Sequence, residues 1–183
     1  MKNRENSAID YSKSGMTIQQ AMLDHVKRYP QKESRRGHII WAEHAIKTAD
    51  WWSVPVKGNI VAEILSVKKS IDQGFDFNVE GHLLLAGGEK VSLLRTWADD
   101  RYEDIVRYPY YSKSGRICIW NVYKMCYPNG KMIEEKWTGN AGFWVESVSE
   151  NERIYHCSHG AAISPDFETL KFMVSILPAD VSE

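Results

Sequence analysis

The sequence has few cysteines and no long apolar stretch. Its three cysteines, Cys118, Cys126 and Cys157, are an odd number without the spacing of a disulfide framework, and no Asn-x-Ser/Thr acceptor is present. Both features are typical of a reducing compartment. The polar start of the chain is not followed by a stretch that resembles a signal peptide, and no window is long and apolar enough to cross a bilayer. We therefore expect a cytoplasmic protein with no membrane partner.

The chain also lacks an excess of charge of either sign. Its Lys+Arg count of 23 against an Asp+Glu count of 24 leaves a formal net charge of -1, which provides no global field to hold a phosphate backbone. A local basic run remains at Lys32, Arg35 and Arg36, and such short runs are more often solvated loops. We expect no nucleic acid among the partners.

Several catalytic signatures are missing as well. The sequence has no Gly-x-x-x-x-Gly-Lys-Ser/Thr loop, no Gly-x-Gly-x-x-Gly, no His-Glu-x-x-His and no Gly-x-Ser-x-Gly. P-loop hydrolysis, Rossmann redox chemistry, zincin proteolysis and α/β-hydrolase catalysis are accordingly disfavoured. The run from His156 to His159 does not make a metal site, because strand alternation places His156 opposite Cys157 and His159. We expect neither a metal nor a cofactor.

Helical spacing is confined to the first third of the chain. Thr17 and Gln20 form a capping-box pair, and the apolar pattern that follows them stops at Pro30. A second apolar stripe, over residues 39–49, predicts another helix that ends near Pro55. The sequence therefore predicts two N-terminal helices.

From Gly58 onward the apolar period becomes that of strands. Turn residues such as Gly87-Gly88 and Pro128-Asn129-Gly130 interrupt the pattern and predict tight hairpins between neighbouring strands. The predicted strands are Ile60–Val67, Phe75–Leu85, Val91–Ala98, Ile117–Tyr127, Met132–Thr138, Phe143–Val148 and Ile154–His159.

The end of the chain carries two conflicting signals. Ser164-Pro165-Asp166 is typical of a helix start, whereas the apolar residues of 170–176 alternate like a strand, and we predict a closing helix. The expected fold class is α+β, with two N-terminal helices packed on a curved antiparallel meander of about six to eight strands, either an open cone or barrel-like. Residues 1–16 are expected to be a flexible arm and residues 17–183 a single domain.

Aromatic residues are plentiful enough to line a pocket. The chain has seven tryptophans, nine tyrosines and five phenylalanines, which suit either a ligand cavity or a filled core. The predicted strand 117–127 carries apolar side chains on both faces, with Ile119 on one and Trp120 on the other. Such a pattern indicates a strand that is covered on both sides.

The longest break between predicted strands, residues 99–115, is a candidate pocket mouth or partner surface. It contains Tyr102, Tyr108, Tyr110 and Tyr111, and long loops in compact domains are often binding loops. The alternative is a helical plug over one end of the sheet, since Asp100 and Glu103 make a capping box. The pentapeptide of residues 111–115 repeats that of residues 11–15, which we interpret as a reused turn.

Histidines near carboxylates are the candidate acid–base groups. Histidine titrates near neutral pH and a carboxylate can orient it, so the candidate catalytic residues are Glu43, His44, His156 and His159. Arg95 alternates with Trp97 on one strand face, where a glutamate such as Glu134, Glu135 or Glu146, or an anionic ligand, has to neutralise it. The candidate ligand-binding residues are Arg95, Trp97, Tyr102, Tyr108, Trp120, Tyr123 and Trp144.

Two functions of different classes fit these features. The first is a small-molecule-binding protein that holds an apolar or planar ligand in an aromatic-lined pocket of the sheet, with simple acid–base turnover of the isomerase or lyase type as an extension. The second is a cytosolic interaction module, such as an inhibitor or immunity protein, that occludes a partner with aromatic and charged side chains. The direction of the tyrosines in residues 99–115 separates them: a concave lining favours the ligand, and a flat outward patch favours the partner.

Overall fold

The computed structural model describes residues 9–30, 37–99 and 105–179. The described part of the chain is mostly β, with 57% of the described residues in strands and 9% in helical segments. The predicted α+β class is therefore wrong. The elements in chain order are η1 (Tyr11–Lys13), α1 (Ile18–Arg28), β1 (Ile39–Trp41), β2 (His44–Ile46), β3 (Asp50–Ser53), β4 (Lys57–Val67), β5 (Gln73–Leu84), β6 (Lys90–Trp97), β7 (Ile105–Cys126), β8 (Met132–Glu135), β9 (Gly142–Ser149), β10 (Glu152–Ser158) and β11 (Leu170–Leu177).

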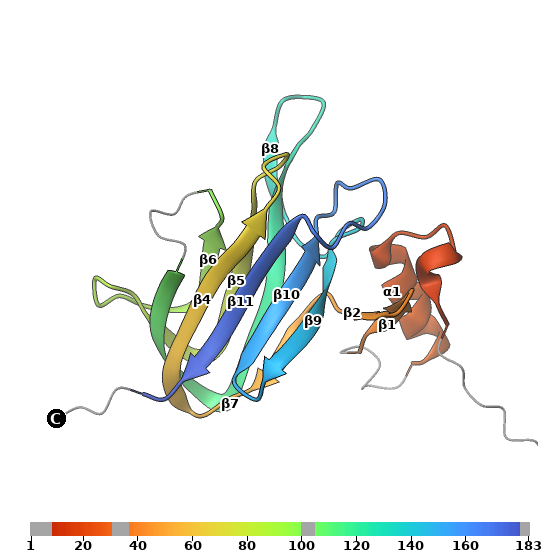
Figure 1. The fold of residues 1–183 in the computed structure, drawn as a ribbon. Helices are drawn as coiled ribbons and strands as arrows, with labels where there is room; N and C mark the ends of the chain where they lie inside the picture. Colours follow the sequence, from red (N-terminus) through yellow and green to blue (C-terminus); the bar gives the residue numbers. More distant parts are fainter. Residues whose placement is uncertain (1–8, 31–36, 100–104, 180–183) are drawn as a thin grey trace, which may run out of the picture.

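Nine strands form one antiparallel sheet, which does not close into a barrel (Figure 1). Its order is β6-β5-β7-β4-β11-β10-β9, with β3 and β8 paired to β7 beside this path. Every predicted strand between residues 60 and 159 is present. The predicted meander holds only in part, because β4 pairs with β7 and β11 rather than with its chain neighbour β5.

Strand β7 is the longest element and takes part in both halves of the sheet. Its first part, Ile105–Tyr111, pairs with β4, and its second part pairs with β3 and β8. Between them the chain bulges: the Ser112 hydroxyl donates to the carbonyl of Arg116 at 2.7 Å and accepts the amide of Arg116 at 3.0 Å. Gly115 has a φ of 63° there, which is the left-handed region that favours glycine.

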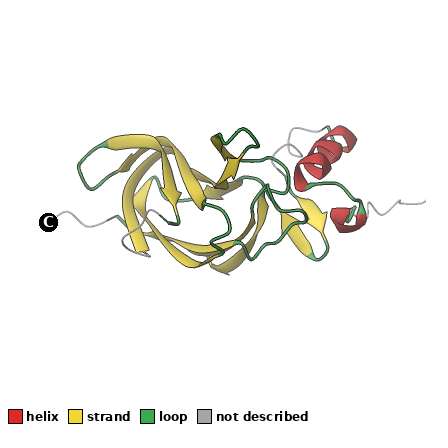
Figure 2. Ribbon diagram, turned by 90° about the horizontal axis from the view of Figure 1, so that it is seen from above, coloured by secondary structure: helices red, strands yellow, loops and turns green. Residues whose placement is uncertain are grey.

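The sheet folds back on itself (Figure 2), and aromatic side chains fill the space between its halves. Phe75 on β5 stacks on Phe172 of β11 with ring centroids 4.2 Å apart, although β7 and β4 separate the two strands in the sheet. Tyr155 covers the other side of Phe172 at 4.8 Å, and Phe143 packs against Tyr155 at 5.5 Å. These four rings are fully buried, so the interior is a packed aromatic core.

A second, smaller core lies at one end of the sheet, where α1 and the hairpin β1–β2 pack beside β9 (Figure 1). The predicted capping box is confirmed, because the Thr17 hydroxyl accepts the amide of Gln20 and the Gln20 side chain accepts the amide of Thr17. The helix ends before Pro30, as predicted. Tyr11 of η1 is buried in this core and donates its hydroxyl to Asp24 at 2.8 Å.

The second predicted helix is wrong. Residues 39–46 form the hairpin β1–β2, and residues 50–53 form β3. The apolar stripe over residues 39–49 fits a helix, but Ile39-Ile40-Trp41 are β-branched and aromatic residues that prefer strands. Ala42 closes the hairpin turn with a φ of 54°, a conformation that ends any regular helix.

Two further predictions fail in the second half of the chain. The closing helix is instead strand β11, in which Phe172, Val174 and Ile176 are buried and alternate with partly exposed residues at 171 and 173. The predicted loop 99–115 is strand from Ile105 onward. Residues 100–104, with the predicted cap and Tyr102, lie outside the described residues, as do residues 1–8 of the predicted arm and the basic run at 32–36.

Both faces of the predicted strand 117–127 are covered over its first seven residues, as expected. Residues 117–123 of β7 are each less than a tenth exposed, including the cysteine and tryptophan at 118 and 120 on the face that points away from the aromatic core. Aromatic side chains therefore cover both faces of this strand. Hollows remain on the outer surface of the sheet.

Candidate functional site

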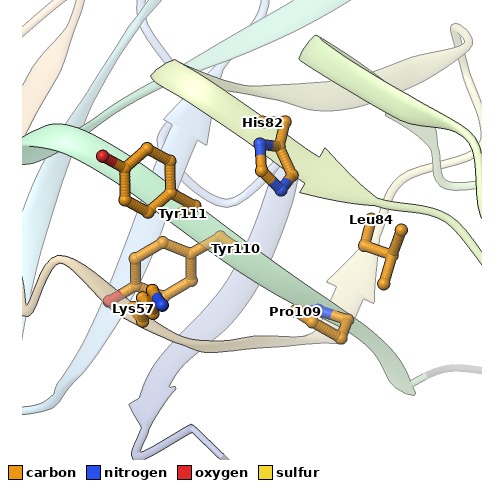
Figure 3. Close-up of a pocket in the computed structure, with 6 residues that line it drawn as sticks. All are labelled: Lys57, His82, Leu84, Pro109, Tyr110 and Tyr111. Carbon is orange, nitrogen blue, oxygen red and sulfur yellow. The ribbon is translucent and has the colours of Figure 1, made fainter.

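A hollow of about 410 Å³ lies where β4, β5 and β7 meet (Figure 3). We call it the tyrosine pocket. Its open side faces solvent, because its lysine and proline are exposed. The residues that line it are Lys57, His82, Leu84, Pro109, Tyr110 and Tyr111.

Strand register brings three of these side chains into one row. Tyr111 on β7 is paired with Lys57 on β4 and with His82 on β5, and directly paired residues project to the same side of a sheet. Leu84 and Pro109 each lie two residues from a member of this row and share its face. The His82 and Tyr111 rings are 5.7 Å apart and tilted by 35° (Figure 3).

Two glycines allow the strands to approach at this point. A Cβ atom at Gly81 would lie 2.1 Å from the carbonyl oxygen of Tyr111, and one at Gly58 would lie 2.7 Å from the carbonyl oxygen of Leu177 and 3.0 Å from the Tyr110 ring. Neither position accepts a side chain without a shift of the backbone. Both glycines therefore help to shape the pocket.

The floor of the pocket is neutral and its rim is basic. Tyr110 is 5% exposed and donates its hydroxyl to the carbonyl of Pro55 at 3.0 Å, and burial raises the pKa of Tyr110 to about 12. Lys57 is the charged residue of the lining, His82 adds a second nitrogen donor, and the described lining residues include no carboxylate. The electrostatics of the hollow therefore favour a ligand with negative charge.

The predicted ligand-binding residues that the structure describes do not all come together in one place. Tyr108 is partly buried and packs against the aromatic core from β7. Tyr123 is 1% exposed, and its hydroxyl is hydrogen-bonded to Thr138. Trp120 lies in a separate groove, and Tyr102 lies outside the described residues.

Arg95 and Trp97 belong to an ion-pair network. Arg95 donates two hydrogen bonds of 2.8 Å to the buried carboxylate of Asp76 and one of 2.5 Å to Glu134. The hydrogen bond to Asp76 raises the pKa of Arg95 above its usual value. Cations lie over the Trp97 ring, with Arg95 Cζ at 5.7 Å and Lys124 Nζ at 4.6 Å. Glu134, one of the predicted internal partners, is thus in contact with Arg95, although Asp76 is the principal one.

Two of the candidate catalytic histidines stack on Trp144, one of the candidate ligand-binding residues. The imidazole of His44 is parallel to the Trp144 ring at 4.4 Å and 7°, and that of His156 is parallel to it at 3.7 Å and 8°. Two imidazoles stacked this closely do not fit on one indole face, so they sandwich Trp144 between them. We call this arrangement the histidine stack, and it joins the hairpin β1–β2 to β9 and β10.

The carboxylates around the histidine stack lie close to the histidines of the stack. Glu43 lies 3.8 Å from His44, while Nε2 of His156 is 3.1 Å from Glu146 and its Nδ1 is 3.6 Å from Glu168. Both ring nitrogens of His156 thus face carboxylates, and the side chain is 7% exposed. A buried imidazole in this position has no open side for a substrate, so we interpret the histidine stack as a structural clamp.

Replacing Trp144 with alanine is expected to lower the free energy of unfolding by about 2 kcal/mol, less than the ~3–5 kcal/mol of a fully buried aromatic residue because Trp144 is only partly buried. Urea denaturation measures the change. The ring-proton resonances of His44 and His156 should also lose their ring-current shift. Trp137→Ala, at a half-exposed site elsewhere, is the matched control, and equal small losses for both variants would contradict the clamp.

The remaining predicted catalytic residue, His159, lies apart from this stack. Its ring centroid is 6.2 Å from that of Tyr123. Burial lowers the pKa of His159, an effect that the charge of Asp166 opposes, so the imidazole is mainly neutral at pH 7. The described residues hold no cluster of three His, Cys, Asp or Glu side chains suited to a metal ion.

Comparisons with known proteins find no relative: no family model, no curated protein and no solved structure matches this chain. Within the described ranges, no helix has the length and apolar character that a membrane crossing requires. The geometry of the hollows is therefore the basis for inferring a function.

Half of the six residues that line the tyrosine pocket lie outside every site predicted from the sequence. Tyr110 and Tyr111 fall in the segment that was singled out as a pocket mouth, but Lys57 and His82 were missed. A usable signal was present in Gly58 and Gly81, because a glycine inside a strand pattern often marks a close backbone approach.

Proposed function

We propose that the protein binds a small planar ligand with a negative charge in the tyrosine pocket. The observation that carries the proposal is that Tyr110 and Tyr111 line a hollow of about 410 Å³ beside Lys57. A concave lining of this kind supports the small-molecule function over the interaction module, for which flat outward tyrosines are expected.

The lining supplies one partner for each part of such a ligand. Leu84, Pro109 and the face of Tyr111 offer apolar surface to a flat ring. Lys57 and His82, which flank Tyr111 in the same row, offer donors to a carboxylate or phosphate at the edge of that ring. The proposal is for binding alone, because acid–base turnover needs a carboxylate near the histidine and none is among the described residues that line the pocket.

The test is a calorimetric titration with 2-naphthoate and with its uncharged analogue 2-naphthylmethanol. Tyr111→Ala removes the stacking surface, so we expect about tenfold or greater weakening for both compounds. Lys57→Met keeps most of the apolar stem but removes the charge. It should weaken the binding of 2-naphthoate by at most about fivefold, which is the range of an exposed ion pair. The affinity for 2-naphthylmethanol should not change.

Lys131→Met, at an exposed lysine in the β7–β8 turn, is the matched control and should bind both compounds like the parent protein. Unfolding curves of all three variants establish that each is folded. Binding of 2-naphthoate that is insensitive to both Tyr111→Ala and Lys57→Met, or no binding by the parent protein at millimolar concentration, would contradict the proposal.

A further inference from the structure

A second hollow, of about 480 Å³, lies on the other face of β7 from the aromatic core and is formed by β3, β5, β7 and the segment after β8. We call it the tryptophan groove. None of the residues that line it carries a charge, which distinguishes it from the tyrosine pocket. They are Thr48, Ala49, Trp51, Asn78, Cys118, Trp120 and Trp137.

The floor of the tryptophan groove is also formed by residues that are paired across neighbouring strands. Cys118 on β7 is paired with Trp51 on β3 and with Asn78 on β5, which gives one row across three strands. Trp120 lies two residues further along β7 and projects to the same face. The groove therefore rests on the regular part of the sheet.

Trp137 forms one wall of the groove in an uncommon backbone conformation. Its φ is 61°, in the left-handed region, and its ring packs edge-on against Trp120 with centroids 5.4 Å apart and an interplanar angle of 60°. Trp137 is 42% exposed and Trp51 is 45% exposed. The groove thus presents two accessible indole surfaces above a buried one.

The buried indole has an unmet hydrogen-bonding need. Trp120 is 6% exposed, and its Nε1–H has no acceptor among the described residues. Buried donors are nearly always paired, and an exception calls for a ligand, a water or another explanation. The ammonium of Lys136 lies 4.9 Å from the Trp120 ring and 4.5 Å from the Trp137 ring, but it is itself a donor and cannot accept this proton.

We propose that the tryptophan groove binds a neutral saccharide ring. A pyranoside has apolar C–H faces that pack on indole surfaces, and hydroxyl groups at its rim that accept and donate hydrogen bonds. One hydroxyl oxygen accepts the Nε1–H of Trp120, while the Thr48 hydroxyl and the Asn78 amide bind others. Because Trp120 Nε1 is buried, the half-exposed Trp137 ring, which packs edge-on against Trp120, moves aside to uncover the donor.

The polar groups of Trp120, Thr48 and Asn78 favour a hydroxylated ring over an unsubstituted apolar one. A flat hydrocarbon would fill the groove but leave the buried Trp120 Nε1–H without an acceptor, which costs free energy. The ligand class therefore differs from that of the tyrosine pocket, and this inference is independent of the proposed function.

The test follows the indole N–H resonances of ¹⁵N-labelled protein during titration with methyl glycosides of glucose, galactose and mannose. We expect at least one glycoside to shift the Trp120 and Trp137 resonances saturably, with a dissociation constant in the millimolar range. Trp120→Phe keeps a ring but removes the donor and should weaken that binding about tenfold. Trp137→Ala, at a half-exposed position, is the second variant and should also weaken it.

Trp97→Phe, on the same face but outside the groove, and Tyr111→Ala, in the tyrosine pocket, should bind the glycoside like the parent protein. 2-Naphthol serves as the planar competitor. Absence of a saturable shift at Trp120 with every glycoside would overturn the inference, as would saturable binding of 2-naphthol alone. Glycoside binding that survives both Trp120→Phe and Trp137→Ala would overturn it as well.

Discussion

Replacing Asp50 with alanine is expected to lower the free energy of unfolding by about 3–5 kcal/mol, the range for removing one member of a buried charge network. Asp50 is 1% exposed and accepts hydrogen bonds from Lys47 at 2.7 Å, Arg153 at 2.7 Å and Tyr155 at 2.9 Å. Arg153 also lies over the Trp52 ring at 4.2 Å. The substitution leaves one buried hydroxyl and two cations without their acceptor.

The pH dependence of stability gives the same network a second test. Burial tends to raise the pKa of Asp50, but the hydrogen bond from Lys47 and the charges of Lys47 and Arg153 outweigh it, so the net pKa lies below the usual value. A depressed folded-state pKa adds stability above the unfolded value of about 3.9, and that stability is lost as pH falls through the folded value. Asp50→Ala should therefore flatten the acid limb of the stability curve below about pH 4.

Asp166→Ala is the matched control for Asp50→Ala. Asp166 pairs with Lys68 at 2.6 Å, but both side chains are about half exposed, so the loss should stay within about 1 kcal/mol. Urea denaturation at a series of pH values measures both variants. Equal losses for the two would contradict the view that Asp50 ties β3 to β10 across the folded sheet.

Replacing Phe172 with alanine is expected to cost about 3–5 kcal/mol, the range for a fully buried aromatic residue. Phe172 is 0% exposed and lies between Phe75 and Tyr155 in a continuous stack. Its removal takes away the contact between strands β5 and β11 and leaves a cavity that the fixed neighbours cannot close. Chemical denaturation measures the free energy of unfolding. The comparison requires that the variant is folded at low denaturant concentration.

Phe172→Leu is the companion substitution because it keeps most of the apolar volume. It should cost about 1–1.5 kcal/mol, well below the alanine variant. Leu65→Ala, at an exposed position on β4, should change stability by no more than about 0.5 kcal/mol. A loss for Phe172→Ala as small as that for Leu65→Ala would show that the two halves of the sheet do not pack through this ring.

The strands were predictable because their signals are local. Alternation and turn glycines lie within a few residues of each other, and they correctly placed all seven predicted strands and the cap at Thr17. The errors arose where two local patterns overlapped. Residues 39–49 fit a helical stripe and a hairpin equally well, and contacts of β2 with the distant strand β9 favour the hairpin.

The candidate sites were less predictable because they depend on register between distant strands. Trp144, His44 and His156 were each singled out, but no local pattern indicates that β2 places an imidazole over β9. The row of Lys57, Tyr111 and His82 requires three strands to align across 54 residues. Periodicity specifies which face a side chain occupies, whereas its neighbours on that face follow from the pairing order.

The most direct test of ligand binding in the tyrosine pocket is a set of intermolecular nuclear Overhauser effects from bound 2-naphthoate. The ring protons of the ligand should give cross-peaks to Tyr111, His82 and Leu84, which line the pocket (Figure 3). The same cross-peaks should disappear in Tyr111→Ala. Cross-peaks to Trp51 or Trp137 instead, or saturable binding with no cross-peak to any residue of the tyrosine pocket, would contradict the account.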